Sequence, residues 1–153
     1  MKYNCQKHLE LLKYKHELMQ KGKFLSREDY QQLLHYSGWI LEHLHWSNRS
    51  NYKKLMNDFL DAKICGRQFD EKFTQMFTKI EDHPLVESYE GIKNLKLSPN
   101  SLGFEDLVYH IYVCCEEFFD EYDPKEEFDP VLRTEEQLRE DVKNVLPKMQ
   151  KYV

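Results

Sequence analysis

Apolar residues recur every three or four positions along most of this chain, and this period constrains the fold more than any other feature. The clearest case is segment 104–122, whose apolar residues fall at i, i+3, i+4, i+7, i+8, i+11, i+14, i+15 and i+18. Such spacing places them on one face of a helix. No segment keeps the alternation of a strand, and only five glycines are present to make tight turns. The sequence therefore predicts an all-α fold, an antiparallel helical bundle.

Five further segments have the same period, and two of them begin with a recognisable capping pattern. Ser26 starts an S-x-x-D sequence, and Thr134 opens the capping box Thr-Glu-Glu-Gln. Asp123-Pro124 should end the helix that begins at 104, and Pro147 should kink or end the last helix. The remaining predicted helices cover residues 5–21, 27–45, 52–60, 69–80 and 134–149.

The segment 81–103 differs from the rest because prolines, glycines and asparagines interrupt it and no period persists. We predict a long connector with a short helix near 85–90, longer than is usual inside a compact domain. On this basis residues 1–50 form a basic N-terminal pair of helices. Residues 51–153 form a four-helix bundle that contains the connector.

The chain has no apolar run near 18 residues and no secretory signal at its start. We therefore expect no membrane span and a cytoplasmic location, or the interior of an organelle if the protein is encoded there. In such a compartment cysteines stay reduced. We expect the four cysteines to be small buried hydrophobic residues; they are Cys5, Cys65, Cys114 and Cys115.

Sequence motifs for catalysis or metal binding are absent. His35, Trp39 and His43 share one helix face, with His45 and Trp46 just beyond, but the two-turn separation of His35 and His43 does not suit one ion. We interpret them as an aromatic packing face with partly exposed imidazoles. The chain has no HExxH, GxSxG, P-loop or GxGxxG. We therefore expect no catalytic residue, no cofactor and no metal, and an enzyme is the weakest hypothesis.

Charge is divided unevenly between the two halves of the chain. Residues 1–80 hold 14 Lys and Arg against 9 Asp and Glu, whereas residues 81–153 hold 8 against 18. Phosphates would be repelled by the second half, so direct nucleic-acid binding is not expected there. The basic N-terminal helices are compatible with it.

The acids concentrate at the end of the predicted fifth helix and in the loop after it. Their mutual repulsion is unfavourable, and so is their position at the negative end of the helix dipole. A sequence that breaks two local rules in one place is a candidate functional site. We predict a surface that binds a basic protein; a face that only keeps the chain in solution is the alternative. The candidate residues are Glu116, Glu117, Asp120, Glu121, Asp123, Glu126, Glu127 and Asp129.

Three segments resemble the bacterial self-protective colicin-like immunity family, in the same order. Residues 55–69 (LMNDFLDAKICGRQF) are similar to its helix, short break and next helix start. Residues 118–124 (FFDEYDP) are similar to its D-x-Y-x-P helix end. Residues 134–143 (TEEQLREDVK) are similar to its last helix.

The resemblance covers residues from about 55 to 147 and implies a four-helix antiparallel bundle. It also implies a non-enzymatic inhibitor whose acidic surface occupies the RNA cleft of a tRNA-cleaving toxin. By position, the implied contacts are Asp120, Glu121, Asp123, Glu126 and Glu127. The alternative is a structural accessory subunit of a larger assembly, organellar or ribonucleoprotein, since the same bundle can serve another role.

Overall fold

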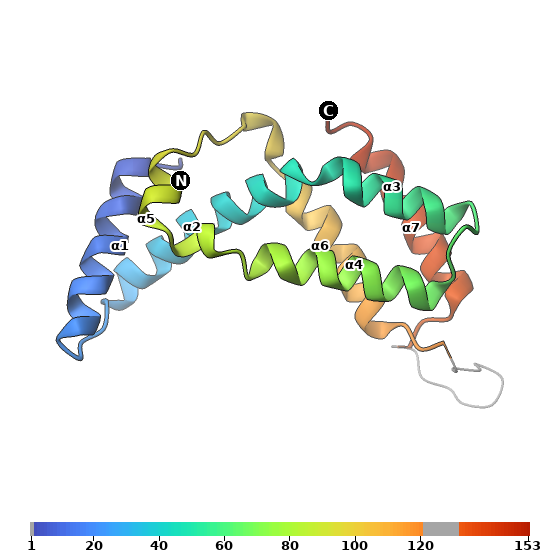
Figure 1. Cartoon of the computed structure of the whole chain (residues 1–153), viewed down its shortest axis with the longest axis horizontal. Coiled ribbons are helices and arrows are strands. Elements are labelled where there is room, and N and C mark those ends of the chain that lie inside the picture. The colour runs from blue at the N-terminus through green and yellow to red at the C-terminus, as the bar shows by residue number, and fades with distance from the viewer. Residues whose placement is uncertain (1, 121–131) are drawn as a thin grey trace.

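The computed structural model describes residues 2–120 and 132–153, and within these ranges the protein is an all-α helical bundle, as the periodicity predicts (Figure 1). No helix in the described ranges is long and apolar enough to cross a membrane. The α-helices, in chain order, are α1 (Cys5–Gln20), α2 (Arg27–Ser47), α3 (Arg49–Leu60), α4 (Gly66–Glu81), α5 (Tyr89–Lys93), α6 (Phe104–Glu117) and α7 (Glu135–Met149).

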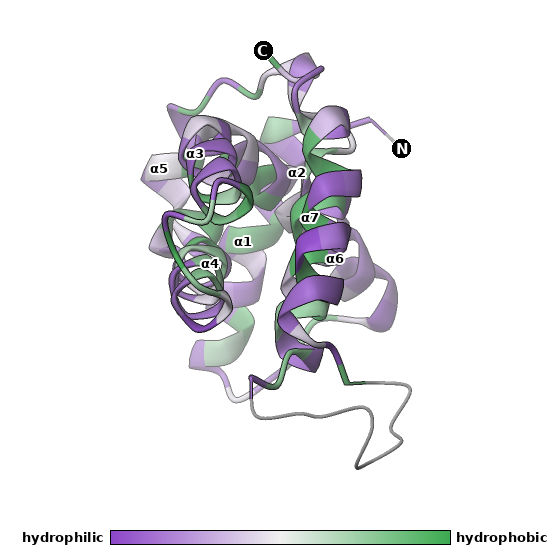
Figure 2. Ribbon diagram, turned by 90° about the vertical axis from the view of Figure 1, so that its right-hand side faces the viewer, coloured by the Kyte–Doolittle hydropathy of each residue, from purple (hydrophilic) through white to green (hydrophobic). Residues whose placement is uncertain are grey.

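The main core lies between α3, α4, α6 and α7, each of which packs against two of the others. Their apolar faces point toward one another and their polar faces point outward (Figure 2). Aromatic rings fill much of this core. Phe59 and Phe69 stack with ring centroids 4.5 Å apart, and Phe73 lies 5.4 Å from Phe69. Burial of these faces is the main force that holds the four helices together.

A smaller second core lies between α1 and α2. Leu11, Leu33 and Tyr36 form it, and α5 packs along α1 beside it (Figure 1). The C-terminal end of α2 reaches the main core, where Leu44 and Trp46 pack against the four-helix bundle. The long helix α2 therefore contacts both cores.

The connector 81–103 contains more helical structure than the sequence predicts. In place of one helix near 85–90, it forms the 3₁₀ turn η1 (Pro84–Glu87), then α5, then the 3₁₀ turn η2 (Pro99–Ser101). Ile92 of α5 is buried. Its packing against the rest of the fold stabilises α5, which is too short to persist alone.

The prediction of one helix over 104–122 is wrong for residues 118–120, and residues 121 and 122 lie outside the described part of the chain. Phe118 has an extended backbone (φ −73°, ψ 133°) and forms an isolated parallel bridge with Arg133. The Phe119 N–H donates to the Arg133 carbonyl at 3.1 Å, and the Arg133 N–H donates to the Glu117 carbonyl at 2.7 Å. Phe118 and Phe119 continue the helical spacing, so the pattern cannot reveal that a distant segment supplies competing hydrogen bonds.

Helix starts agree with the capping patterns. The Ser26 hydroxyl accepts from the Asp29 N–H, and Thr134 and Gln137 form the expected capping box of α7. Pro147 does not end α7, which continues to Met149. A proline in the last turn removes one hydrogen bond, and the buried Met149 keeps the end of the helix packed.

The four cysteines are free thiols in differing surroundings. Cys114 and Cys115 are buried in the main core, as predicted, and Cys5 is half-buried. The prediction is wrong for Cys65, which is exposed because it precedes α4 and lies outside its apolar face.

Gly103, the residue just before α6, has a left-handed backbone (φ +85°), and a Cβ there would lie 2.8 Å from the Tyr152 hydroxyl oxygen. We expect Gly103→Ala to lower the free energy of unfolding by more than the backbone strain alone, which is about 1–2 kcal/mol. Gly22→Ala is the matched control, because Gly22 also has a positive φ (+68°) but open space around it. If urea unfolding shows that Gly103→Ala and Gly22→Ala lose the same free energy of unfolding, the Tyr152 side chain moves away from the new Cβ without penalty.

Candidate functional site

The candidate acidic surface lies where α6 ends, close to the start of α4. Of the eight predicted acids, the structure places three: Glu116 and Glu117 in the last turn of α6, and Asp120 shortly after it. Glu116 and Asp120 are exposed, and Glu117 is half-buried. The other five lie outside the described residues; they are Glu121, Asp123, Glu126, Glu127 and Asp129.

The fold adds acids from another helix to this surface. Asp70 on α4 is half-buried, and its pKa is raised to about 6 by burial and by the charges of Glu116, Glu71 and Asp120. A carboxyl becomes harder to ionise when other carboxylates are close and solvent is partly excluded. The negative field is therefore concentrated between α4 and α6. We call Asp70, Glu71, Glu116, Glu117 and Asp120 the acidic end.

Two arginines offset part of this charge. The Arg67 Nε donates to an Asp120 carboxylate oxygen at 2.7 Å, and the Arg133 Nε lies 3.3 Å from Glu117. Both pairs are at least partly exposed to solvent, where an ion pair contributes little net stability. These arginines set the positions of Asp120 and Glu117, and five carboxyls against two guanidiniums leave the acidic end negative.

The raised pKa of Asp70 predicts a pH dependence of stability. Its folded pKa of about 6 lies above the ordinary value of about 3.9, so between these values the folded protein binds more protons than the unfolded chain. The stabilising contribution of protonated Asp70 to the free energy of unfolding is fully present below about pH 4 and is lost as the pH rises through 6. We expect Asp70→Asn to gain stability relative to wild type from pH 4 to 7.

Urea unfolding at several pH values tests this prediction, because other titrating groups cancel in the difference between variant and wild type. The control is Asp82→Asn, at an exposed aspartate at the other end of α4. If the difference in free energy of unfolding between Asp70→Asn and wild type does not change from pH 4 to 7, the pKa of Asp70 is not raised.

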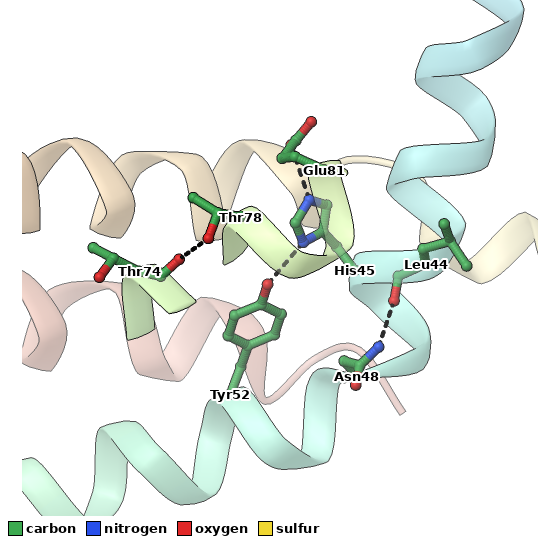
Figure 3. A network of polar contacts seen from close by, with 7 residues as sticks. All are labelled: Leu44, His45, Asn48, Tyr52, Thr74, Thr78 and Glu81. Atoms are coloured by element: carbon green, nitrogen blue, oxygen red, sulfur yellow. Dashed lines mark hydrogen bonds and ion pairs between the residues drawn. The ribbon is translucent and has the colours of Figure 1, made fainter. Parts of the chain in front are cut away.

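The structure also shows a buried polar cluster that the sequence does not indicate. His45, at the end of α2, is fully buried. Its Nδ1 lies 2.8 Å from the Tyr52 hydroxyl of α3, and its Nε2 lies 3.0 Å from a Glu81 carboxylate oxygen of α4 (Figure 3). The ring stacks on Phe77 with centroids 4.8 Å apart. Residues from three helices thus meet at one imidazole.

A second carboxyl, Glu105 in the first turn of α6, completes this cluster. One ligand atom from each of His45, Glu81 and Glu105 lies within 4.8 Å of the others. Burial raises the pKa of Glu105 to about 7, and the charges of Glu81 and Glu42 act in the same direction. Glu42 accepts a hydrogen bond from the Gly103 N–H, which holds the start of α6 against α2.

The histidine face expected on α2 is only partly as predicted. His35 is exposed and accepts a long hydrogen bond from the Trp39 indole (3.4 Å), and the half-buried His43 accepts from the Ser98 N–H (3.2 Å). His45 departs from the expectation of partly exposed imidazoles. The signal missed was its position two residues beyond His43, which turns it away from that face and toward the main core.

A third feature is an apolar surface at the turn between α1 and α2. Large apolar side chains remain exposed there: Phe24 by 90%, Met19 by 59%, Leu34 by 53% and Tyr30 by 50%. Met19, Phe24, Leu25 and Tyr30 line a shallow groove together with Lys15 and Arg27. A group of exposed apolar side chains of this kind is typical of a protein contact.

Comparison of the chain with protein-family models, with curated proteins and with solved structures found no match.

Proposed function

We propose that this protein is a non-enzymatic binding protein that holds a basic surface of a partner protein against its acidic end. The observation that most supports this is the convergence of Asp70 on α4 with Glu116 on α6 and Asp120 just after α6. Burial raises the pKa of Asp70 to about 6, and the charges of these acids act in the same direction. Such crowding is unfavourable for the isolated protein. A basic partner would turn it into attraction and lower the pKa of Asp70.

In its most specific form, the proposal is an immunity protein that inhibits an RNA-cleaving toxin. The nuclease's active site would be basic because it holds the RNA backbone, and the acidic end would take the place of the phosphates. The similarity of residues 55–69, 118–124 and 134–143 to the immunity family supports this form. Glu116, Glu117 and Asp120 are the described residues that would face the partner.

Charge reversal on the acidic end tests the proposal. We expect Glu71→Lys/Glu116→Lys to slow association with the partner at least tenfold at low salt and to flatten its salt dependence, because long-range attraction speeds encounter. Both residues are exposed, and the change avoids the two acids held by Arg67 and Arg133. The partner is first isolated by crosslinking in an extract of the source organism.

The matched control is Glu17→Lys/Glu28→Lys, which makes the same change in net charge at exposed sites on α1 and α2. If control and test variants slow association equally, the overall charge and not the acidic end attracts the partner. That result would contradict the proposed site.

The exposed apolar surface between α1 and α2 favours a second candidate, an accessory subunit of a larger assembly. A subunit of that kind would use the groove around Phe24 as well as the acidic end. We expect Phe24→Ser to release it from the assembly, whereas an immunity protein would keep its single partner. Recovery of many proteins rather than one basic nuclease would favour the accessory role. Their loss after RNase treatment would indicate RNA beside the basic N-terminal helices.

A further inference from the structure

We propose that His45, Glu81 and Glu105 form a binding site for one divalent transition-metal ion, with Zn²⁺ as the probe. The site lies where α2, α4 and α6 meet in space, and it is separate from the acidic end. Its donor atoms are the His45 Nε2 and one carboxylate oxygen from each glutamate. The proposal does not depend on the proposed binding function.

The geometry of the cluster suits one ion. The three donor atoms already lie within 4.8 Å of one another. Two donors bound to one Zn²⁺ at about 2.0–2.2 Å lie at most about 4.4 Å apart. Small rotations of the two glutamate side chains would therefore close the site, with no change in the helices.

Charge favours a cation at this position. The groups that act on the Glu105 carboxyl besides burial are all carboxyls: Glu81, Glu42 and Asp106. Two carboxylates pressed together beside a buried ring must share a proton or a cation. A doubly charged ion would balance Glu81 and Glu105, with the imidazole as a neutral ligand.

The surroundings of His45 match those of a metal-ligating histidine. Such a ring is usually held by a hydrogen bond at its other nitrogen. Here the Tyr52 hydroxyl lies 2.8 Å from Nδ1 (Figure 3). Phe77 stacks on the ring. Because a hydroxyl can donate or accept, the ring proton can move to Nδ1 when Nε2 binds the ion. The ring would not need to turn.

The donor set and the exposure identify the class of ion. Mg²⁺ and Ca²⁺ prefer oxygen ligands alone, whereas imidazole together with carboxylate suits Zn²⁺ and its neighbours. Glu81 keeps 29% of its side chain exposed, so an ion has a route from solvent and room for a water in its fourth position.

Isothermal titration of the chelator-treated full chain with ZnCl₂ tests the proposal. We expect one site, with affinity at least tenfold weaker in Glu105→Gln and in Glu81→Gln. These near-isosteric changes keep the fold, which a circular dichroism melt verifies. Glu17→Gln and Cys65→Ser, at exposed residues away from the cluster, should bind as wild type does. An affinity that is unchanged in Glu105→Gln, or absent in wild type, would overturn the proposal.

The imidazole provides a second readout that no other site would give. In the ¹⁵N spectrum of His45 we expect the ring proton to lie on Nδ1 once Zn²⁺ is bound, and Nε2 to show the shift of a metal ligand. Zn²⁺ binding that leaves both His45 nitrogens unchanged would place the ion elsewhere and contradict the site.

Discussion

Replacing Phe69 by alanine is expected to lower the free energy of unfolding by about 3–5 kcal/mol, the usual range for removal of a buried phenyl ring. Phe69 has no exposed surface, and it lies between Phe59 and Phe73 at the junction of α3 and α4. The variant loses the transfer energy of the ring and leaves a cavity that the two neighbouring rings cannot refill. Two-state urea unfolding followed by circular dichroism measures the difference.

Phe24→Ala is the matched control, because it removes the same atoms from a side chain that is 90% exposed. A change at such a surface position is usually within about 0.5 kcal/mol. A loss below about 1 kcal/mol for Phe69→Ala would mean that the core between α3 and α4 is not packed as described.

The second large effect is expected at His45, measured with a chelator present so that no metal contributes. His45→Leu keeps most of the volume but removes both hydrogen bonds of the ring. The fully buried Tyr52 hydroxyl then loses its partner, and the half-buried Glu81 loses one. An orphaned buried polar group costs about 1–3 kcal/mol. With the lost hydrogen bond to Glu81 added, we expect the free energy of unfolding of His45→Leu to decrease by about 2–4 kcal/mol.

A double-mutant cycle separates this effect from a general loss of packing. Adding Tyr52→Phe to His45→Leu removes the orphaned hydroxyl, so the double variant should be more stable than His45→Leu alone. If the two changes simply add, the hydroxyl is satisfied elsewhere and the 2.8 Å contact is not a stabilising hydrogen bond.

Much of the fold was predictable because it depends on local chemistry. Ser26 and Thr134 cap helices through bonds that span three residues, and both helices begin where the patterns indicate. The end of α6 was not predictable. Phe118 continues the helical spacing, but Arg133, fifteen residues along the chain, supplies backbone hydrogen bonds in place of another turn of helix.

The candidate sites divide in the same way. Glu116, Glu117 and Asp120 were visible as a run of acids, but Asp70 was not, because it lies 46 residues before Glu116 on another helix. His45, Glu81 and Glu105 have no spacing in common that a motif can describe. The sequence places them in three separate segments, with His45 at the end of one predicted helix, Glu81 in the predicted connector and Glu105 near the start of another helix.

The sequence by itself determined that this protein is all-α, where most of its helices begin, which faces they bury and how strongly its second half is acidic. Those properties follow from interactions within one or two turns of helix and from composition. The tertiary structure decided which helices meet, and therefore that Asp70 joins the acids at the end of α6 and that His45 faces two glutamates. The physical reason is that burial and electrostatic coupling depend on distance in space, and only packing brings residues remote in the chain to within a few ångströms.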